Sequence, residues 1–248
     1  MRENRLSTFV AGLVVALPGE CRSLTRRRLA RGECLRLDER RLLCLAGIGQ
    51  GSARRAAVRL LEAGAHGLLS WGCAGALSPA LGVGALCLPT AILDGAGGSV
   101  PVSAPWHERA RASLGGHVEL HIDPLLSIDR IAASTEYKRA LATRFAATAV
   151  DMESAAVATV AGEAQVPFLA VRAIADRAST ALPGAVLRAT NAEGTVDLGT
   201  LFRHGVLDPA GWPSLIRLAR DFRIAVRTLS VVARQLADDP LLGPTSRV

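Results

Sequence analysis

The sequence predicts an α/β protein with a mixed, mostly parallel sheet flanked by helices, formed as one domain over residues 1–248. Three observations support this prediction. The apolar segments are short and continuous, which is typical of strands that are buried on both faces. Segments with helical spacing alternate with them, and glycine-rich turns follow several of them. A chain of 248 residues with 50% hydrophobic and 21% charged residues has the size and composition of one such domain.

The first half of the chain contains four apolar segments that we interpret as strands. They are Phe9–Leu17, Arg40–Ala46, Gly67–Trp71 and Ala85–Leu93. Glycine-rich turns at 47–51 and 72–75 are expected to end the second and third strands. Apolar residues at helical spacing predict a helix over Ala53–Ala63, and Ser52 is its expected N-cap.

The second half continues the alternation of helices and strands. The expected elements are helices over Ala140–Phe145, Ser154–Glu163 and Pro213–Leu236, and strands over Ala146–Val150 and Phe168–Ile174. Residues 179–199 lack periodicity, which makes them a candidate lid over a site. The last helix has an apolar stripe and many arginines, so it either packs on the sheet or contacts a membrane surface or another subunit.

The net charge of the chain is strongly positive, but charge alone does not identify a partner. The net charge is +7, and Lys138 is the only lysine among 29 cationic side chains. A basic chain can bind nucleic acid, but aromatic residues make up only 4% of this one, and Tyr137 is its single tyrosine. Base stacking needs aromatic side chains interleaved with basic ones, so we expect no nucleic-acid partner.

The cysteines and histidines predict neither a metal site nor disulfides. The five cysteines are at least ten residues apart and form no CxxC pair, and the five histidines show no ligand spacing. We expect reduced thiols, no cofactor and a cytoplasmic protein. The apolar N-terminal segment is followed by Pro18-Gly19-Glu20, which is a poor cleavage site, so it is interpreted as a strand and not as a signal peptide.

Two glycine-rich turns are candidates for contact with a ligand. The first, 47–51, has the spacing of a dinucleotide-binding turn but lacks an acid about 20 residues later to hold a ribose. Tight helix packing and approach to a substrate both remain open for it. The second, 72–75, allows a flat ligand to lie against the backbone. Cys73 as a nucleophile is the alternative, although no histidine forms a recognisable pair with it.

Acidic residues follow three of the predicted strands. They are Glu20, the pair Asp151 and Glu153, and Asp176. The carboxyl ends of parallel strands meet at one edge of a sheet, so these groups are expected to converge there. The alternatives are acids that stabilise helix N-termini and, for Asp176, an ion pair with Arg172 or Arg177.

Five segments together resemble the nucleoside phosphorylase and nucleosidase superfamily, which includes methylthioadenosine/adenosylhomocysteine nucleosidase. They are Ala16-Leu17-Pro18-Gly19-Glu20, Gly47-Ile48-Gly49-Gln50-Gly51, Gly72-Cys73-Ala74-Gly75-Ala76-Leu77, Val150-Asp151-Met152-Glu153-Ser154 and Val171-Arg172-Ala173-Ile174-Ala175-Asp176. Their order and approximate spacing match over residues 9 to 178. Within the superfamily the chain looks most like the hopanoid-associated branch.

The resemblance implies a division of roles among the site residues. Asp176 is the general acid that protonates the purine near N7, and Glu20 activates the attacking water. Glu153 holds the ribose 2′ and 3′ hydroxyls, with Met152 packed beside the sugar. The other residues expected to bind substrate are Cys73, Ala74, Gly75, Ile131 and Asp151.

Some positions depart from the pattern of the family. Ser70 replaces an arginine that holds phosphate in the phosphorylases, Cys73 replaces a serine, and Ile131 replaces a base-stacking aromatic. Loss of the guanidinium favours water as the nucleophile, although Arg22, Arg54 or Arg55 could compensate.

The resemblance therefore implies a purine nucleosidase that releases adenine from adenosylhopane in hopanoid biosynthesis. A homo-oligomer, a lipid-linked adenosyl substrate and peripheral contact with the inner membrane surface are part of this expectation. Phosphorolysis of the same bond and a non-catalytic nucleoside-binding protein are the alternatives.

Overall fold

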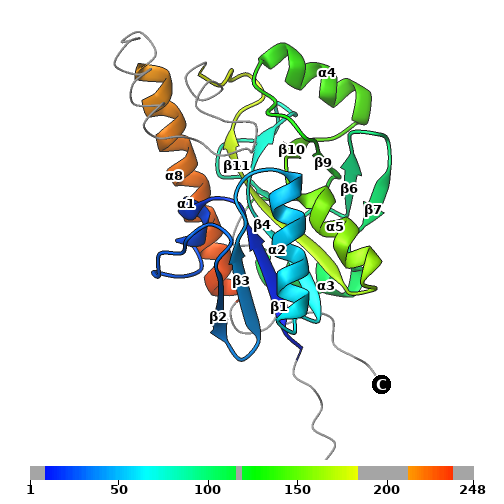
Figure 1. Cartoon of the computed structure of the whole chain (residues 1–248). Helices are drawn as coiled ribbons and strands as arrows, with labels where there is room; N and C mark the ends of the chain where they lie inside the picture. Colours follow the sequence, from blue (N-terminus) through cyan, green and yellow to red (C-terminus); the bar gives the residue numbers. More distant parts are fainter. Residues whose placement is uncertain (1–8, 116–118, 184–211, 237–248) are drawn as a thin grey trace, which may run out of the picture.

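The computed structural model describes residues 9–115, 119–183 and 212–236. Within these residues eleven strands form one sheet, and six of the ten strand pairings are parallel. Helices lie around the sheet (Figure 1). The prediction of an α/β fold with a mixed, mostly parallel sheet is therefore confirmed.

The strands are β1 Ala11–Val15, β2 Cys34–Asp38, β3 Arg41–Leu45, β4 Gly67–Ala76, β5 Leu86–Cys87, β6 Ala91–Asp94, β7 Ser99–Pro101, β8 Leu120–His121, β9 Leu125–Ser127, β10 Ala149–Asp151 and β11 Phe168–Asp176. The helices are α1 Pro18–Cys21, α2 Gln50–Glu62, α3 Ala104–Leu114, α4 Thr135–Phe145, α5 Ser154–Glu163 and α8 Trp212–Gln235. The main path of the sheet has the strand order β2-β3-β1-β4-β10-β9-β6-β7. A branch begins at β4, where β11 pairs with β4, β5 pairs with β11 and β8 pairs with β5.

Strand β4 is the centre of the sheet and the point where it branches. Its first half pairs in parallel with β1, its end pairs antiparallel with β10, and β11 runs beside it. The expected end of this strand at Trp71 is wrong, because β4 continues to Ala76. Pairing with β10 and β11 keeps these small residues extended, so the second glycine-rich segment is strand and not turn.

Other local expectations also differ from the structure. The apolar run Ala85–Leu93 forms two strands, β5 and β6, because Pro89 lies between them and lacks a backbone donor. Helix α2 begins at Gln50 with Gly49 as its N-cap, so Ser52 lies inside the helix. The Ser52 hydroxyl accepts a hydrogen bond from Arg31 at 2.8 Å.

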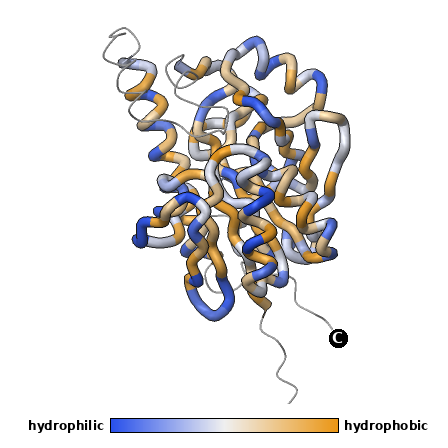
Figure 2. The backbone as a smooth tube through the Cα atoms, viewed as in Figure 1, coloured by the Kyte–Doolittle hydropathy of each residue, from blue (hydrophilic) through white to orange (hydrophobic). Residues whose placement is uncertain are grey.

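The helices cover the sheet from two sides. Helices α2 and α5 pack against each other and against β1 and β4, while α8 packs along β11 and passes behind β2 and β3 in Figure 1. Figure 2 shows hydrophobic residues concentrated along the central strands and hydrophilic ones at the tip of the β2–β3 hairpin. None of the helices in the described ranges is long and apolar enough to cross a membrane.

Helix α8 has a packed half and a projecting half. Ala225, Leu229 and Val232 are fully buried in the core. Trp212 and Ile216, in the first turns, are 41% and 61% exposed. The interpretation of this helix as packed on the sheet therefore holds for its C-terminal half. Of the candidate lid at 179–199, residues 184–199 lie outside the described residues.

Candidate active site

A cavity of about 250 Å³ opens at the carboxyl edge of the sheet. The residues that line it come from the ends of β1, β4, β10 and β11, from α1 and α8, and from the loops that contain Ile48, residues 130–132 and Leu182. All nine residues proposed from the sequence are among them, namely Glu20, Cys73, Ala74, Gly75, Ile131, Asp151, Met152, Glu153 and Asp176. The structure thus brings together side chains that are up to 156 positions apart in the chain.

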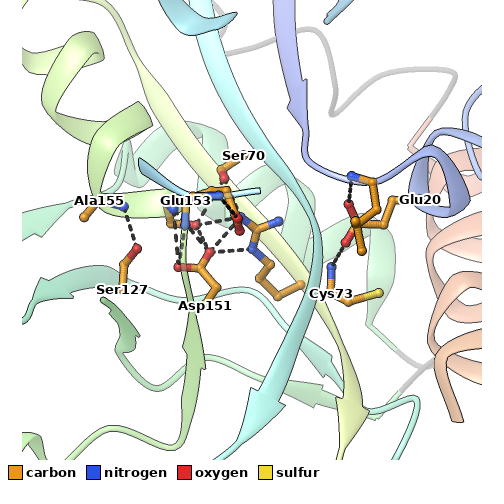
Figure 3. Close-up of polar contacts among 11 residues, drawn as sticks. Glu20, Ser70, Cys73, Ser127, Asp151, Glu153 and Ala155 are labelled. Atoms are coloured by element: carbon orange, nitrogen blue, oxygen red, sulfur yellow. Dashed lines mark hydrogen bonds and ion pairs between the residues drawn. The ribbon is translucent and has the colours of Figure 1, made fainter. Parts of the chain in front are cut away.

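Glu20 is fixed by the short helix that follows β1. Pro18 begins α1, and Glu20 at its third position reaches back so that Oε2 accepts from the Leu17 N–H at 2.9 Å. Its Oε1 accepts from the Cys73 N–H at 2.7 Å (Figure 3). Burial raises the pKa of Glu20, while the nearby Arg172 guanidinium and the two N–H donors oppose that rise.

Arg172 of β11 holds a buried network at the base of the cavity. Its Nε and Nη2 lie 2.7 and 2.6 Å from Asp151 Oδ2, and Nη2 donates to the hydroxyls of Ser70 and Ser154 at 2.7 and 3.1 Å. The Asp151 side chain has no exposed surface. The carboxylate of Asp151 therefore orients Arg172, and its expected role in substrate binding stays a prediction.

Gly72 makes room for this arrangement. A Cβ atom at this position would lie 2.5 Å from Arg172 Nη1 and 2.7 Å from Glu20 Oε1. In the sheet Gly72 is the register partner of Arg172. A side chain there would push apart the arginine and the glutamate, so the glycine serves close packing of charged groups and not a turn.

Glu153 connects the first glycine-rich turn to the site. It follows β10 and is the N-cap residue of α5, but its side chain makes no capping bond. The Ala155 N–H in the first turn of α5 instead donates to Ser127 Oγ at 3.0 Å (Figure 3). Glu153 Oε1 accepts from the Gly49 N–H at 2.8 Å, and Gly49 has φ +90°. Burial and the neighbouring Asp151 raise the pKa of Glu153 to about 7. Of the two interpretations of the turn, the structure supports approach to the site.

Asp176, the last residue of β11, pairs with a residue that sequence reasoning did not assign. Its Oδ2 accepts a hydrogen bond from Lys138 Nζ of α4. The expected alternatives, ion pairs with Arg172 or Arg177, are not formed, since Arg172 contacts Asp151. Burial raises the pKa of Asp176, and the Lys138 ammonium opposes this rise.

Several apolar side chains complete the walls. They are Leu17, Ile48, Ile131 and Leu182, together with Leu218 and Phe222 of α8. Ile131, which replaces the aromatic residue that the resemblance implied, is part of this wall, and Phe222 is the one aromatic side chain in the lining among the described residues. The amphipathic pattern of the last helix indicated a buried stripe but not that part of this stripe faces a cavity.

The chemistry of the site is that of carboxyl groups. Burial and the neighbouring Glu20 raise the pKa of the Cys73 thiol, so Cys73 does not provide a thiolate at neutral pH. Among the described residues, no three His, Cys, Asp or Glu side chains are grouped as metal ligands. The available groups can accept hydrogen bonds from hydroxyls, exchange protons and polarise a water molecule.

The branched mixed sheet with a cavity at its carboxyl edge is the architecture expected of the nucleoside phosphorylase class. A family model described as the phosphorylase superfamily matches residues 12–197. The match covers most of the chain, and the chain belongs to this superfamily. A comparison with curated protein sequences found no significant match.

Solved structures agree with this fold. Futalosine hydrolase of Helicobacter pylori superposes with a TM-score of 0.69 at 17% identity, covering 93% of this chain and 98% of that chain. Methylthioadenosine/adenosylhomocysteine nucleosidase of Neisseria meningitidis, in complex with methylthio-immucillin-A, gives 0.69 at 19% identity with the same coverage. A mutant of the Helicobacter pylori nucleosidase with 5′-methylthioadenosine in its active site gives 0.64 at 18% identity, covering 92% of this chain and 99% of that chain. At these identities the likeness shows the fold.

Proposed function

We propose that this protein is a purine nucleosidase that hydrolyses the N-glycosidic bond of an adenosyl compound. The observation that supports this most directly is the convergence of Glu20, Glu153 and Asp176 on one cavity of about 250 Å³. Each carboxyl group has a different set of partners, although Arg172 lies near both Glu20 and Glu153, so the three can take different roles. A nucleoside offers a matching set of groups, namely a purine nitrogen to protonate, a ribose diol to bind and an anomeric carbon to attack.

The proposed reaction assigns one step to each acid. Asp176 donates a proton to N7 of the purine as the bond from C1′ to N9 breaks and the electron pair leaves with the base. Glu20 accepts a proton from water while the water oxygen bonds to C1′ of the ribosyl cation. Glu153 accepts hydrogen bonds from the ribose hydroxyls. Burial raises the pKa of Asp176, which favours the protonated acid that this step requires.

The surroundings of Glu20 favour water over phosphate as the nucleophile. The Cys73 N–H, which would be a donor to an anion, is already bound by the Glu20 carboxylate. Ser70, in place of the phosphorylase arginine, is buried and contacts Arg172. A carboxylate facing the nucleophile also repels a phosphate dianion.

The arginines suggested as substitutes for the phosphorylase arginine do not reach the site. Arg54 pairs with Glu163 on the surface, and Arg55 contacts Ser52. Neither they nor Arg22 line the cavity. Phosphorolysis is therefore the weaker alternative.

The finer proposal for the substrate is adenosylhopane, with adenine and ribosylhopane as products. The resemblance of the sequence motifs to the hopanoid-associated branch and the apolar side chains Leu17, Leu218 and Phe222 in the lining support it. Exposed Trp212 and Ile216, with the arginines of α8, would suit contact with an anionic bilayer from which such a lipid is collected. Assembly into a homo-oligomer belongs to the same proposal.

The test is release of adenine from adenosylhopane in anionic vesicles and from 5′-methylthioadenosine, each with and without phosphate. We expect adenine without phosphate and, from the lipid, free ribosylhopane identified by mass. A ribose 1-phosphate product that forms only with phosphate would establish phosphorolysis instead. Adenine from methylthioadenosine alone would remove the lipid substrate but keep the nucleosidase. No release from either substrate, with binding retained, would favour the nucleoside-binding alternative.

A further inference from the structure

Lys138 is a buried charged residue that the proposed reaction does not use. It is the only lysine of the chain, it lies in the first turn of α4, and it is 1% exposed. Its ammonium donates to Asp176 Oδ2, to the Arg177 carbonyl at 2.8 Å and to the Thr180 carbonyl at 3.0 Å. Burying an ammonium is costly unless its three donors are satisfied, and here all three have acceptors.

The start of α4 holds this ammonium in place. The Ser134 hydroxyl accepts from the Tyr137 N–H at 3.0 Å and caps the helix, and the Ser134 carbonyl accepts from the Lys138 N–H. The Ala133 carbonyl accepts from the Leu182 N–H at 2.8 Å, which joins the segment after β11 to the same helix end. Lys138 therefore links α4, the end of β11 and the Arg177–Thr180 turn at one point.

The contact with Lys138 also makes the two carboxyl oxygens of Asp176 different from each other. The carboxyl group lies against Gly75 in the wall of the cavity, where a Cβ would be 3.1 Å from Oδ1 and 3.2 Å from Oδ2. Only Oδ2 is occupied by Lys138. The fixed oxygen cannot rotate towards the purine without leaving the ammonium. Oδ1 is then the oxygen available to the base.

We propose that Lys138 is the positioning residue of Asp176, holding one carboxyl oxygen so that the other faces the purine and fixing the turn that follows. This proposal rests on the proposed function, because it assigns Lys138 a part in delivering the proton of Asp176. Lysine suits the task because an ammonium reaches three acceptors in different directions, whereas the planar arginine fork does not.

The charged groups around Asp176 set the direction of the pH effect. The charged ones are Lys138 from α4, Asp221 and Arg217 from α8 and Arg177 next in the chain, and the Cys73 thiol of β4 is a neutral titratable neighbour. Asp221 adds to the rise in the pKa of Asp176 that burial causes, and Lys138 opposes it. Removing the ammonium must therefore raise the pKa of Asp176 further, so the acid keeps its proton to higher pH.

The test compares Lys138→Met with Arg139→Met, which removes an exposed cation from the same helix. We expect Lys138→Met to lower kcat by about 10- to 100-fold, because the acid is no longer oriented. The alkaline limb of the pH profile of kcat should also move to higher pH by about 1 to 3 units. Arg139→Met should change neither. A lower kcat with an unmoved alkaline limb would reduce Lys138 to a structural role and overturn the proposal.

A second measurement does not depend on how the variant folds. Labelling the protein with ¹⁵N-lysine gives one side-chain signal, because Lys138 is the only lysine. Adenine contacting Oδ1 should shift this signal in the wild-type protein, and a saturating titration that leaves it in place contradicts the proposal. A wild-type protein without nucleosidase activity would remove the proposed function and this inference together. If the wild-type protein is active but the alkaline limb of kcat or the ¹⁵N signal of Lys138 does not move, only the inference about Lys138 is removed.

Discussion

At the scale of single residues, the site gives each carboxyl group a different partner. Glu20 accepts hydrogen bonds from two backbone N–H groups, and Glu153 accepts a hydrogen bond from one and lies near Asp151. Asp176 contacts the ammonium of Lys138. Burial raises the pKa of all three, so the partners decide how far each departs from an exposed acid. Acids with different environments can hold and accept protons in the same pH range.

The first prediction concerns the general acid. Asp176→Asn keeps the shape of the side chain but removes the proton that the purine needs, so adenine release should fall by about 10²- to 10⁴-fold. The KM of the substrate should change much less than kcat, because the cavity is intact. Steady-state kinetics measure both values, and the thermal unfolding midpoint checks that the variant is folded. Turnover close to wild type would remove Asp176 from the mechanism.

A second prediction tests the space beside Arg172. Gly72→Ala places a methyl group 2.5 Å from Arg172 Nη1 and 2.7 Å from Glu20 Oε1, so one of them must move. We expect a loss of about 1–3 kcal/mol in unfolding free energy, as for overpacking, together with lower activity. The matched control is Gly51→Ala in α2, where the added Cβ lies 3.6 Å from Arg55 Nη1 and is in ordinary contact.

Denaturant unfolding of both glycine variants measures the difference. Alanine in a helix is favoured over glycine, so Gly51→Ala should leave stability unchanged or raise it by up to about 1 kcal/mol. Equal effects of the two substitutions would show that Gly72 is not constrained by its charged neighbours.

The candidate acids could be found from the sequence, but their partners could not. Glu20, Glu153 and Asp176 each follow an apolar segment, and the ends of neighbouring strands meet at one edge. The contact of Lys138 with Asp176 depends instead on how α4 packs over the end of β11. A lone lysine among arginines was visible in the sequence, but nothing in its local pattern indicated burial.

At the scale of elements, the helices and strands with the strongest local sequence pattern were predicted most accurately. Helix α5 has the predicted bounds, because its small apolar residues leave few alternatives and its strand partners flank it closely. Strands β2, β7 and β8 are short or partly polar, so their pairing partners and not their own residues define them. The length of β4 depends on β10, which is more than 70 residues away in the chain.

Helix α8 allows a prediction about its two halves. Leu229 is fully buried against the sheet, so Leu229→Ala should lower the unfolding free energy by about 2–5 kcal/mol. Ile216 is 61% exposed, and Ile216→Ala should stay within about 0.5 kcal/mol of wild type. Urea unfolding measures both. A large loss for Ile216→Ala would mean that the projecting half is covered in solution, for instance by another copy of the chain.

At the scale of the whole molecule, the buried acids couple stability to pH. A carboxyl group with a raised pKa binds a proton in the folded state over a pH range where the unfolded chain has released it. The folded state then holds more protons than the unfolded state, so stability falls as pH rises through that range. For Glu153 the range runs from its ordinary value of 4.5 to about 7, and Glu20 and Asp176 act in the same direction.

Other groups with shifted pKa values act outside this range. Asp38 is partly buried, which opposes ionisation, but Arg41 beside it lowers its pKa, and the resulting stabilisation is complete above its ordinary value of 3.8. Burial raises the pKa of the Cys21 thiol to about 12, so its effect begins only near the ordinary thiol value of 9.0. Between these limits the three cavity acids dominate the pH dependence of the described groups with shifted pKa values.

The last prediction follows from this balance. The unfolding midpoint of the wild-type protein should fall between about pH 5 and about pH 7.5, and Glu153→Gln should make that fall shallower, because the amide does not titrate. The matched control is Glu163→Gln, which changes an exposed glutamate at the far end of the same helix and should leave the slope unchanged. Thermal unfolding across this pH range measures all three proteins. If the fall of the midpoint with pH is unchanged in Glu153→Gln, the titration that causes it lies with Glu20 and Asp176. A wild-type midpoint that rises with pH would contradict the raised pKa of all three cavity acids.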